Sequence, residues 1–177
     1  MKLNGQNPNL DAIRSLYLTA FPLCERKPFS VIEEKQKAGF MEILSIEEED
    51  GTFLGLALTA LFEDLALLDY FAVADDRRNR GVGAEALRLL QKRYEDKRLF
   101  IEIETTEGES DNREERIRRK SFYLRNNMVP LPYVVNLFGV EMEMLSAGGK
   151  MIRFAEYHRM YEEVFHKSKF VKLVREL

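Results

Sequence analysis

Cysteine, tryptophan and histidine are scarce in this sequence of 177 residues, which has one cysteine, no tryptophan and two histidines. Because Cys24 has no second cysteine to pair with, a reducing compartment such as the cytoplasm is expected. Cys24, His158 and His166 lack the spacing of a ligand cluster, so no metal is expected. Only five prolines and ten glycines stand beside 45% hydrophobic residues. This composition excludes a disordered or collagen-like chain and is sufficient for a buried core.

An excess of positive charge and a long hydrophobic run are also lacking. The chain has 27 basic and 30 acidic residues, for a net charge of −3. Proteins that bind nucleic acid or anionic membranes are usually basic, so neither partner is expected. The longest apolar stretch, Leu54 to Phe62, is too short to span a bilayer, and residues 1–8 contain no apolar core of a signal peptide. The sequence therefore predicts a cytoplasmic protein without membrane insertion.

Hydrophobic periodicity and turn residues predict alternating strands and helices. Asp50-Gly51 predicts a hairpin turn, and the run from Leu65 to Ala74, apolar on both faces, predicts a central strand. Capping boxes are expected at Ser30–Glu33 and Asp111–Glu114, and Pro130 and Pro132 are expected to end the helix after the second box. The expected strands lie at about 1–4, 40–48, 52–61, 65–74 and 99–104, with a final pair in 133–146, and further helices lie at about 9–21 and 81–94.

Hairpin strands followed by a strand–helix–strand unit predict a mixed sheet in a single α/β domain with helices on its faces. We expect this domain to span residues 1–147. Gly148-Gly149 then breaks the chain, and residues 148–177 are expected to form a mostly helical extension packed on the same domain. The broad apolar face of that extension must be buried on the sheet, over a cleft or in a homodimer.

The most informative segment connects the apolar strand at 65–74 to the next helix. Glycine lets the backbone come close to a ligand, a helix start offers unpaired N–H groups and a positive dipole end, and arginines add charge. This combination is typical of a pyrophosphate-binding turn. Its candidate residues are Arg78, Asn79, Arg80, Gly81, Val82, Gly83 and Ala84.

One interpretation of this turn is dinucleotide binding, because Gly81-x-Gly83-x-x-Ala86 satisfies that pattern formally. Three features oppose it. Charged residues separate the strand from the glycines, hairpin strands precede the motif in place of repeated strand–helix–strand units, and dinucleotide sites rarely need three arginines beside the first glycine. A nucleotide-linked oxidoreductase therefore stays as an alternative that predicts binding of NAD or NADP and no binding of coenzyme A.

The other interpretation is coenzyme A. Arg78-x-x-Gly81-x-Gly83 after an apolar strand resembles the acyl-CoA-binding signature of the GNAT superfamily of N-acetyltransferases. The stretch from Ser121 to Met128 resembles the superfamily's helix ending in FY-x-x-x-G-F, with Asn127 in the place of glycine and Met128 in the place of phenylalanine. Asparagine tolerates the left-handed conformation that a helix end needs. The resemblance covers residues 1 to 146 in element order, and the extension has no counterpart in the minimal fold.

The resemblance implies a mixed, mostly antiparallel sheet with a central, splayed pair of parallel strands. Acetyl-CoA would insert its pantetheine arm between the strand ending in Phe71, Ala72 and Val73 and the strand from Phe100 to Glu104. The backbone N–H near Val73 would polarise the thioester carbonyl, and the backbone of residues 78–84 would hold the pyrophosphate.

Acetyl transfer to an amine needs a proton acceptor for the ammonium and a proton donor for the departing thiolate. Tyr123 occupies the position of the family's usual general acid; the alternative is a core tyrosine bonded to the backbone. Glu104 is the first candidate for the base, since it lies at the strand end, and Glu102 and Asp69 are further candidates. For these carboxylates the alternative is solvation or an internal ion pair.

The acceptor is expected to be a small-molecule or peptide amine. In this superfamily the loop between the first two helices often lines the acceptor site, which makes Glu25 and Arg26 candidate contacts, together with Asp69 and Glu102. No histidine stands in a partner motif for Cys24, so direct transfer without a cysteine nucleophile is expected. A non-catalytic domain that binds acyl-CoA is the second hypothesis. The basic run at 113–120 is either a solvated helix face or a contact to the adenosine phosphates.

Overall fold

The structure is a computed structural model that describes residues 1–6, 9–23, 25–107 and 111–176. The chain divides into two compact units. Unit 1 contains residues 1–61 and 68–94, and unit 2 contains residues 62–67 and 95–177. Each unit is described separately below.

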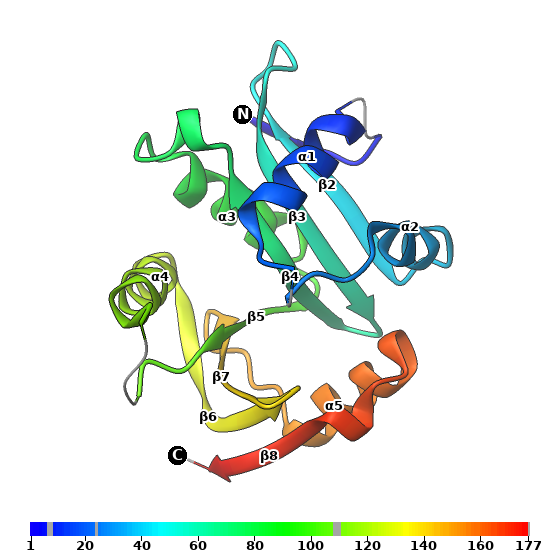
Figure 1. The fold of residues 1–177 in the computed structure, drawn as a ribbon, viewed down its shortest axis with the longest axis vertical. Helices are drawn as coiled ribbons and strands as arrows, with labels where there is room; N and C mark the ends of the chain where they lie inside the picture. The colour runs from blue at the N-terminus through cyan, green and yellow to red at the C-terminus, as the bar shows by residue number, and fades with distance from the viewer. Residues whose placement is uncertain (7–8, 24, 108–110, 177) are drawn as a thin grey trace. The chain divides into compact units, whose positions relative to one another are not determined.

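Unit 1 begins with a short strand and two helices, as expected (Figure 1). The Asp50-Gly51 hairpin is confirmed: Gly51 has a φ of 91° and donates its N–H to the carbonyl of Glu48 at 3.1 Å. A short 3-10 turn at Asp75–Arg77 precedes the last helix. The elements are β1 (Lys2–Asn4), α1 (Leu10–Ala20), α2 (Phe29–Lys37), β2 (Met41–Glu47), β3 (Phe53–Phe62), β4 (Leu65–Val73) and α3 (Val82–Arg93).

Neighbouring side chains of β4 point to opposite faces of the sheet, as the two-residue period of a strand requires. The ring of Tyr70 lies 4.8 Å from the ring of Tyr17 in α1. Phe71, the next residue, packs against a buried cluster from β2, β3 and α3, namely Ile46, Leu54 and Ala86. Within unit 1, α1 therefore covers one face at this point and α3 covers the other.

Unit 2 contains the first residues of β4 and the elements that follow residue 95 (Figure 1). The elements are β5 (Arg98–Glu104), α4 (Arg113–Arg125), β6 (Met128–Leu137), β7 (Val140–Ala147), α5 (Phe154–Phe165) and β8 (Val171–Glu176). In the described part of the chain, no helix is long and apolar enough to cross a membrane.

The hydrogen-bonded order of the strands is β1-β2-β3-β4-β5-β7-β6-β8. The pair β4–β5 is parallel, with Leu65 to Leu67 opposite Arg98 to Phe100. The pairs β1–β2, β2–β3, β5–β7, β6–β7 and β6–β8 are antiparallel. The expectation of a mixed, mostly antiparallel sheet with a central parallel pair is confirmed.

The expected helix caps are wrong in detail. The N-cap of α2 is Pro28, and Ser30 lies inside the helix. The Glu33 carboxylate, expected in the capping box, accepts a bond from Arg14 of α1 at 2.6 Å. The N-cap of α4 is Asn112, which makes no side-chain cap. The sequence Asn7-Pro8-Asn9 also predicts a cap before α1; Asn9 is the N-cap, and residues 7–8 lie outside the described residues.

Helix α4 ends at the motif from Ser121 to Met128, before the two prolines that were expected to end it. The helix ends at Arg125, and Asn127 adopts the left-handed conformation expected for it, with a φ of 63°. Pro130 and Pro132 lie within β6, beside a register shift between Pro130 and Val134. A bulge tolerates proline in a strand because it already interrupts the hydrogen-bond ladder.

The C-terminal extension is less helical than expected. Its helix, α5, is confirmed at Phe154–Phe165, but Val171–Glu176 form β8, which pairs antiparallel with β6. Val171 is buried and the next residues are exposed, so β8 is held by its hydrogen bonds to β6 more than by an apolar face. Long-range pairing of this kind overrides local propensity.

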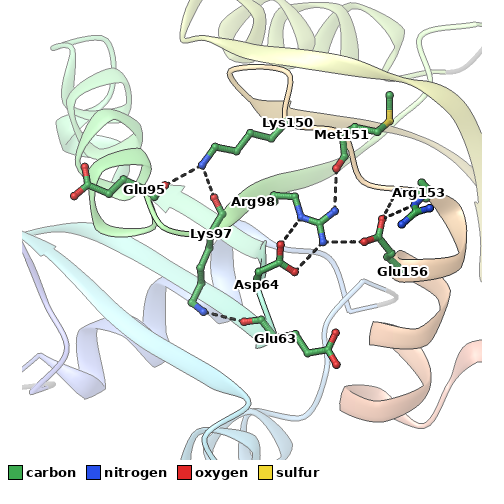
Figure 2. A network of polar contacts seen from close by, with 9 residues as sticks. All are labelled: Glu63, Asp64, Glu95, Lys97, Arg98, Lys150, Met151, Arg153 and Glu156. Atoms are coloured by element: carbon green, nitrogen blue, oxygen red, sulfur yellow. Dashed lines mark hydrogen bonds and ion pairs between the residues drawn. The ribbon is translucent and has the colours of Figure 1, made fainter.

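A polar network ties the extension to the start of β5 (Figure 2). The guanidinium of Arg98 donates two bonds to Asp64, at 2.7 and 2.8 Å, one to Glu156 of α5 at 2.9 Å and one to the carbonyl of Met151 at 2.9 Å. The ammonium of Lys150 donates to two carbonyls of the turn before β5. The bond to Arg98 is the main reason that the pKa of Glu156 is lowered to about 2.

This network predicts a contribution to stability that is lost in acid. Glu156 binds its proton less readily in the folded state, so its contribution is present above the ordinary pKa of about 4.5 and is lost as the pH falls towards 2. In Arg98→Met the loss of unfolding free energy between pH 5 and 2 should be smaller by about 1 kcal/mol, because these side chains are partly exposed. Urea unfolding of the variant and of wild type across this pH range measures the difference. Arg159→Met, which removes the exposed ion pair to Glu63, is the control, and equal pH dependence of Arg98→Met and wild type would contradict the prediction.

Candidate functional site

The turn at residues 78–84 lies between the end of β4 and the first turn of α3. Gly81 is the N-cap of α3 and has a left-handed backbone with a φ of 79°, and no side chain of a described residue caps the helix. Glu85 makes the first intrahelical bond, to the carbonyl of Gly81. The N–H groups of Val82, Gly83 and Ala84 therefore precede the helical ladder, and this is the arrangement that receives anions at helix starts.

The arginines of this turn differ in their partners. Arg78 is half-exposed, pairs with Asp75 at 2.8 Å and donates to the carbonyl of Val73 at 3.3 Å. Arg77 pairs with Asp76. Arg80 is exposed and makes no ion pair with any residue that the structure describes. The turn thus presents charge that is free or weakly held at the surface, which an incoming phosphate can recruit.

The end of β4 approaches β3 closely at one glycine. A Cβ atom on Gly55 would lie 2.4 Å from the carbonyl oxygen of Ala72 and 3.1 Å from the Cα atom of Val73. Only glycine therefore fits at this position without displacing the backbone that is expected to contact acetyl-CoA. Sequence reasoning missed Gly55, although a glycine inside an apolar strand is itself a signal of close backbone approach.

Tyr123 lies in α4 and is 8% exposed. Its ring contacts the ring of Phe122 at 5.1 Å, and burial raises the pKa of its phenol to about 12. Among the described residues, no group forms a hydrogen bond with the Tyr123 hydroxyl. The alternative of a core tyrosine bonded to the backbone is therefore not what the structure shows.

The two carboxylates on β5 have different partners. Glu104 accepts a bond from Arg116 at 2.8 Å, and its second oxygen lies 4.0 Å from the guanidinium of Arg119. Glu102 accepts bonds from the hydroxyls of Tyr157 at 2.6 Å and Tyr161 at 2.8 Å. Glu104 is held by positive charge from α4, and Glu102 is held by neutral donors from α5.

Three of the residues expected near the acceptor come together in unit 1. Lys27 binds both oxygens of Asp69, at 2.8 and 2.7 Å. The hydroxyl of Tyr70 donates to the carbonyl of Glu25 at 2.8 Å, and Arg26 donates to the carbonyl of Leu18. Asp69 thus forms the internal ion pair that was weighed against a catalytic role, and it anchors the loop between α1 and α2. Cys24, in the same loop, lies outside the described residues.

The basic run in α4 is largely engaged with acidic side chains. Besides Arg116, the run places Lys120 2.5 Å from Glu143 of β7 and Arg119 3.3 Å from Glu115. His158 lies against the ring of Phe154, and His166 ends α5 with a φ of 54°. Within the described ranges, no group of three His, Cys, Asp or Glu residues could hold a metal ion.

Comparison with known proteins finds acetyltransferases, both by sequence and by structure. The model of the acetyltransferase (GNAT) family matches residues 10–117. No curated protein matches the chain. A structure from Bacteroides thetaiotaomicron, described as an acetyltransferase of the GNAT family, has a TM-score of 0.75 at 16% identity and covers 96% of this chain and 98% of its own.

Two further structures carry named acceptors. A spermidine N-acetyltransferase variant from Vibrio cholerae has a TM-score of 0.63 at 11% identity, covering 83% of this chain and 94% of its own. The ribosomal-protein-S18-alanine N-acetyltransferase from Escherichia coli has a TM-score of 0.61 at 14% identity, covering 86% of this chain and 99% of its own. At these identities the likeness establishes the fold.

Proposed function

Since its sequence matches the family over residues 10–117, this chain belongs to the acetyltransferase (GNAT) family of acyltransferases, and we propose that it transfers an acetyl group from acetyl-CoA directly to a primary amine. The domain for this reaction would span residues 1–147, with residues 148–177 as an extension. The single cysteine supports a cytoplasmic location. The names of two structural neighbours give their acceptors as spermidine and as an alanine of a ribosomal protein. Both acceptors are amines, and this supports an amine acceptor for this chain, either a small molecule or a peptide.

The observation that carries the donor assignment is the open first turn of α3. Left-handed Gly81 places the N–H groups of Val82, Gly83 and Ala84 ahead of the helical ladder, without a side-chain cap. These groups and the exposed Arg78 and Arg80 fit a pyrophosphate. We propose that residues 78–84 hold the diphosphate of acetyl-CoA and that the backbone of Phe71, Ala72 and Val73 contacts the pantetheine arm and the thioester carbonyl.

The proposed chemistry uses a proton acceptor and a proton donor from this chain. A carboxylate of β5, Glu102 or Glu104, takes a proton from the ammonium of the acceptor. The amine nitrogen then forms a bond to the acetyl carbon as the carbon–sulfur bond breaks. The Tyr123 hydroxyl donates its proton to the departing sulfur, and the second proton released by the nitrogen restores the Tyr123 hydroxyl, so that the products are an amide and coenzyme A. Glu25, Arg26 and Asp69 are proposed to border the acceptor as parts of the anchored loop.

Binding of acetyl-CoA tests the donor assignment. Acetyl-CoA at a hundred times its Kd should add about 2.7 kcal/mol of stability, which raises the melting temperature by several degrees at roughly 2–4 °C per kcal/mol. Dephospho-CoA, NAD and NADP serve as comparison ligands, and Gly83→Val, which places a branched side chain in the turn, should abolish the shift.

The outcomes separate the hypotheses. A shift with NAD or NADP and none with acetyl-CoA would replace the acetyltransferase by a nucleotide-linked enzyme. An unchanged acetyl-CoA shift in Gly83→Val would place the phosphates elsewhere. Binding without release of coenzyme A in the presence of any amine would favour the non-catalytic alternative.

A further inference from the structure

We propose that the C-terminal helix α5 is part of the catalytic apparatus, because its residues Tyr157 and Tyr161 hold the carboxylate of Glu102 in place as the proton acceptor for the amine. This inference rests on the proposed function and goes beyond it in two respects. It chooses between the two carboxylates of β5, and it gives the extension after residue 147 a role in the reaction.

The contact between α5 and β5 is built from buried rings around a partly exposed carboxylate. Tyr157 and Tyr161 are 0% and 2% exposed, whereas Glu102 is only partly buried. The Oε1 atom of Glu102 accepts hydrogen bonds from the hydroxyl of Tyr157 at 2.6 Å and from the hydroxyl of Tyr161 at 2.8 Å. The Oε2 atom lies 3.0 Å from the Tyr161 hydroxyl. Two donors on one carboxylate fix its orientation far better than one flexible contact does.

Aromatic packing keeps the two tyrosines where they are. The ring of Tyr157 meets the ring of Phe100, two residues before Glu102, at 6.1 Å, and the ring of Tyr161 at 5.0 Å. Tyr161 also packs against Phe165 at 5.1 Å. Because Phe100 and Glu102 point to the same side of β5, the register of the strand brings the carboxylate directly to the hydroxyls.

The observed contacts of the two carboxylates differ in charge. For Glu104, taking up a proton would give up its attraction to Arg116 and Arg119. The Tyr157 and Tyr161 hydroxyls that contact Glu102 are neutral, and they can turn and remain bonded to either form of the group. Two carboxylates in different environments, two residues apart on the same face, are the usual arrangement for dividing roles.

Two tyrosines near Glu102, Tyr157 and Tyr133, stay protonated at neutral pH. Burial and the charge of Glu102 raise the pKa of Tyr157 well above its ordinary value. Burial and the charges of Glu156 and Glu102 likewise raise the pKa of Tyr133 on β6. Tyr157 therefore acts as a permanent donor to the Glu102 carboxylate.

The proposed step is a simple proton transfer. The carboxylate of Glu102 takes one proton from the acceptor's ammonium, which leaves a neutral amine with a lone pair for the acetyl carbon, and the protonated Glu102 returns its proton to solvent after the product leaves. Tyr157 and Tyr161 keep their own protons throughout and are positioning residues.

The test compares Tyr157→Phe, Tyr161→Phe and the double variant with wild type. Coenzyme A release from acetyl-CoA is followed with spermidine, an amino acid and a short peptide with a free N-terminus as probes, from pH 5 to 10. Removing donors from a carboxylate makes its charged form less favourable. The acidic limb of kcat/KM for the amine should therefore move up by about one pH unit. At a pH on that limb the rate should fall about tenfold, with the KM for acetyl-CoA unchanged.

Two control variants are measured beside the tyrosine variants. Glu102→Gln should lower turnover by about 100-fold or more. Tyr94→Phe removes a comparable bond, from the Tyr94 hydroxyl to Glu42 at 2.5 Å, and should leave both the pH profile and the rate unchanged. If the double variant fails to fold, the single variants still remove one donor each, and their profiles decide.

The outcomes distinguish this inference from the proposed function. A wild-type protein that releases no coenzyme A with any probe overturns the proposed function and this inference with it. A wild-type protein that turns over, with an unmoved pH profile in the Tyr→Phe variants or full activity in Glu102→Gln, overturns this inference alone and leaves the acetyltransferase in place. A merely structural role for the tyrosines would lower the melting temperature without moving the acidic limb.

Discussion

Replacing Tyr123 by phenylalanine is expected to lower kcat by about 10²–10⁴-fold, with little change in the binding of acetyl-CoA. The phenol has a pKa of about 12, so it is protonated at every pH at which the enzyme works. A coenzyme A thiol has an ordinary pKa of about 8.5. A donor of this strength does not protonate the thiolate after it has formed, so donation must accompany cleavage of the carbon–sulfur bond. The interaction therefore exists in the transition state and not in the ground state.

Steady-state kinetics check this expectation directly. An interaction made only in the transition state lowers kcat and kcat/KM together, whereas a packing defect lowers the amount of folded enzyme and the melting temperature. Phenylalanine keeps the ring of Tyr123 and its contact with Phe122, and Tyr94→Phe controls for loss of a tyrosine hydroxyl elsewhere. Unchanged turnover in Tyr123→Phe would remove this residue from the mechanism.

The second large effect concerns stability and the loop between α1 and α2. Lys27→Met is expected to lower the unfolding free energy by about 3–5 kcal/mol, because it leaves the Asp69 carboxylate, 6% exposed, without its ion-pair partner. Lys27 also lies over the ring of Tyr70 at 5.1 Å, and its carbonyl accepts the hydroxyl of Tyr17 at 2.9 Å. Loss of the ion pair should therefore loosen the loop that carries Glu25 and Arg26.

A double-mutant cycle distinguishes an unpaired charge from lost packing. Replacing both partners, as in Lys27→Met with Asp69→Leu, removes the buried charge altogether, and such replacements are often neutral. The double variant should accordingly be more stable than Lys27→Met alone, measured by denaturant unfolding. Additive losses in the two single variants would show that the ion pair contributes nothing beyond the packing of each side chain.

Local sequence signals predicted the parts of this protein that depend on a few neighbouring residues. Asp50-Gly51 suffices for the hairpin because both residues tolerate the backbone of a tight turn, and Asn127 ends α4 in the left-handed conformation for the same reason. The apolar run of β4, the glycine before α3 and the two motif patches were likewise readable, and with them the family.

The tertiary structure decided the partners of the charged groups and the outer part of the sheet. From the sequence, Glu102 and Glu104 are two carboxylates on one face of a strand, and only the position of Glu104 at the strand end favours it as the base. They differ because α5, 55 residues further on for Tyr157, brings hydroxyls to one, while α4 brings guanidinium groups to the other. Asp69 meets Lys27 across 42 residues, and residues 171–176 form a strand because β6 offers an edge. Such contacts depend on which elements the fold places together, and no local pattern of residues contains that information.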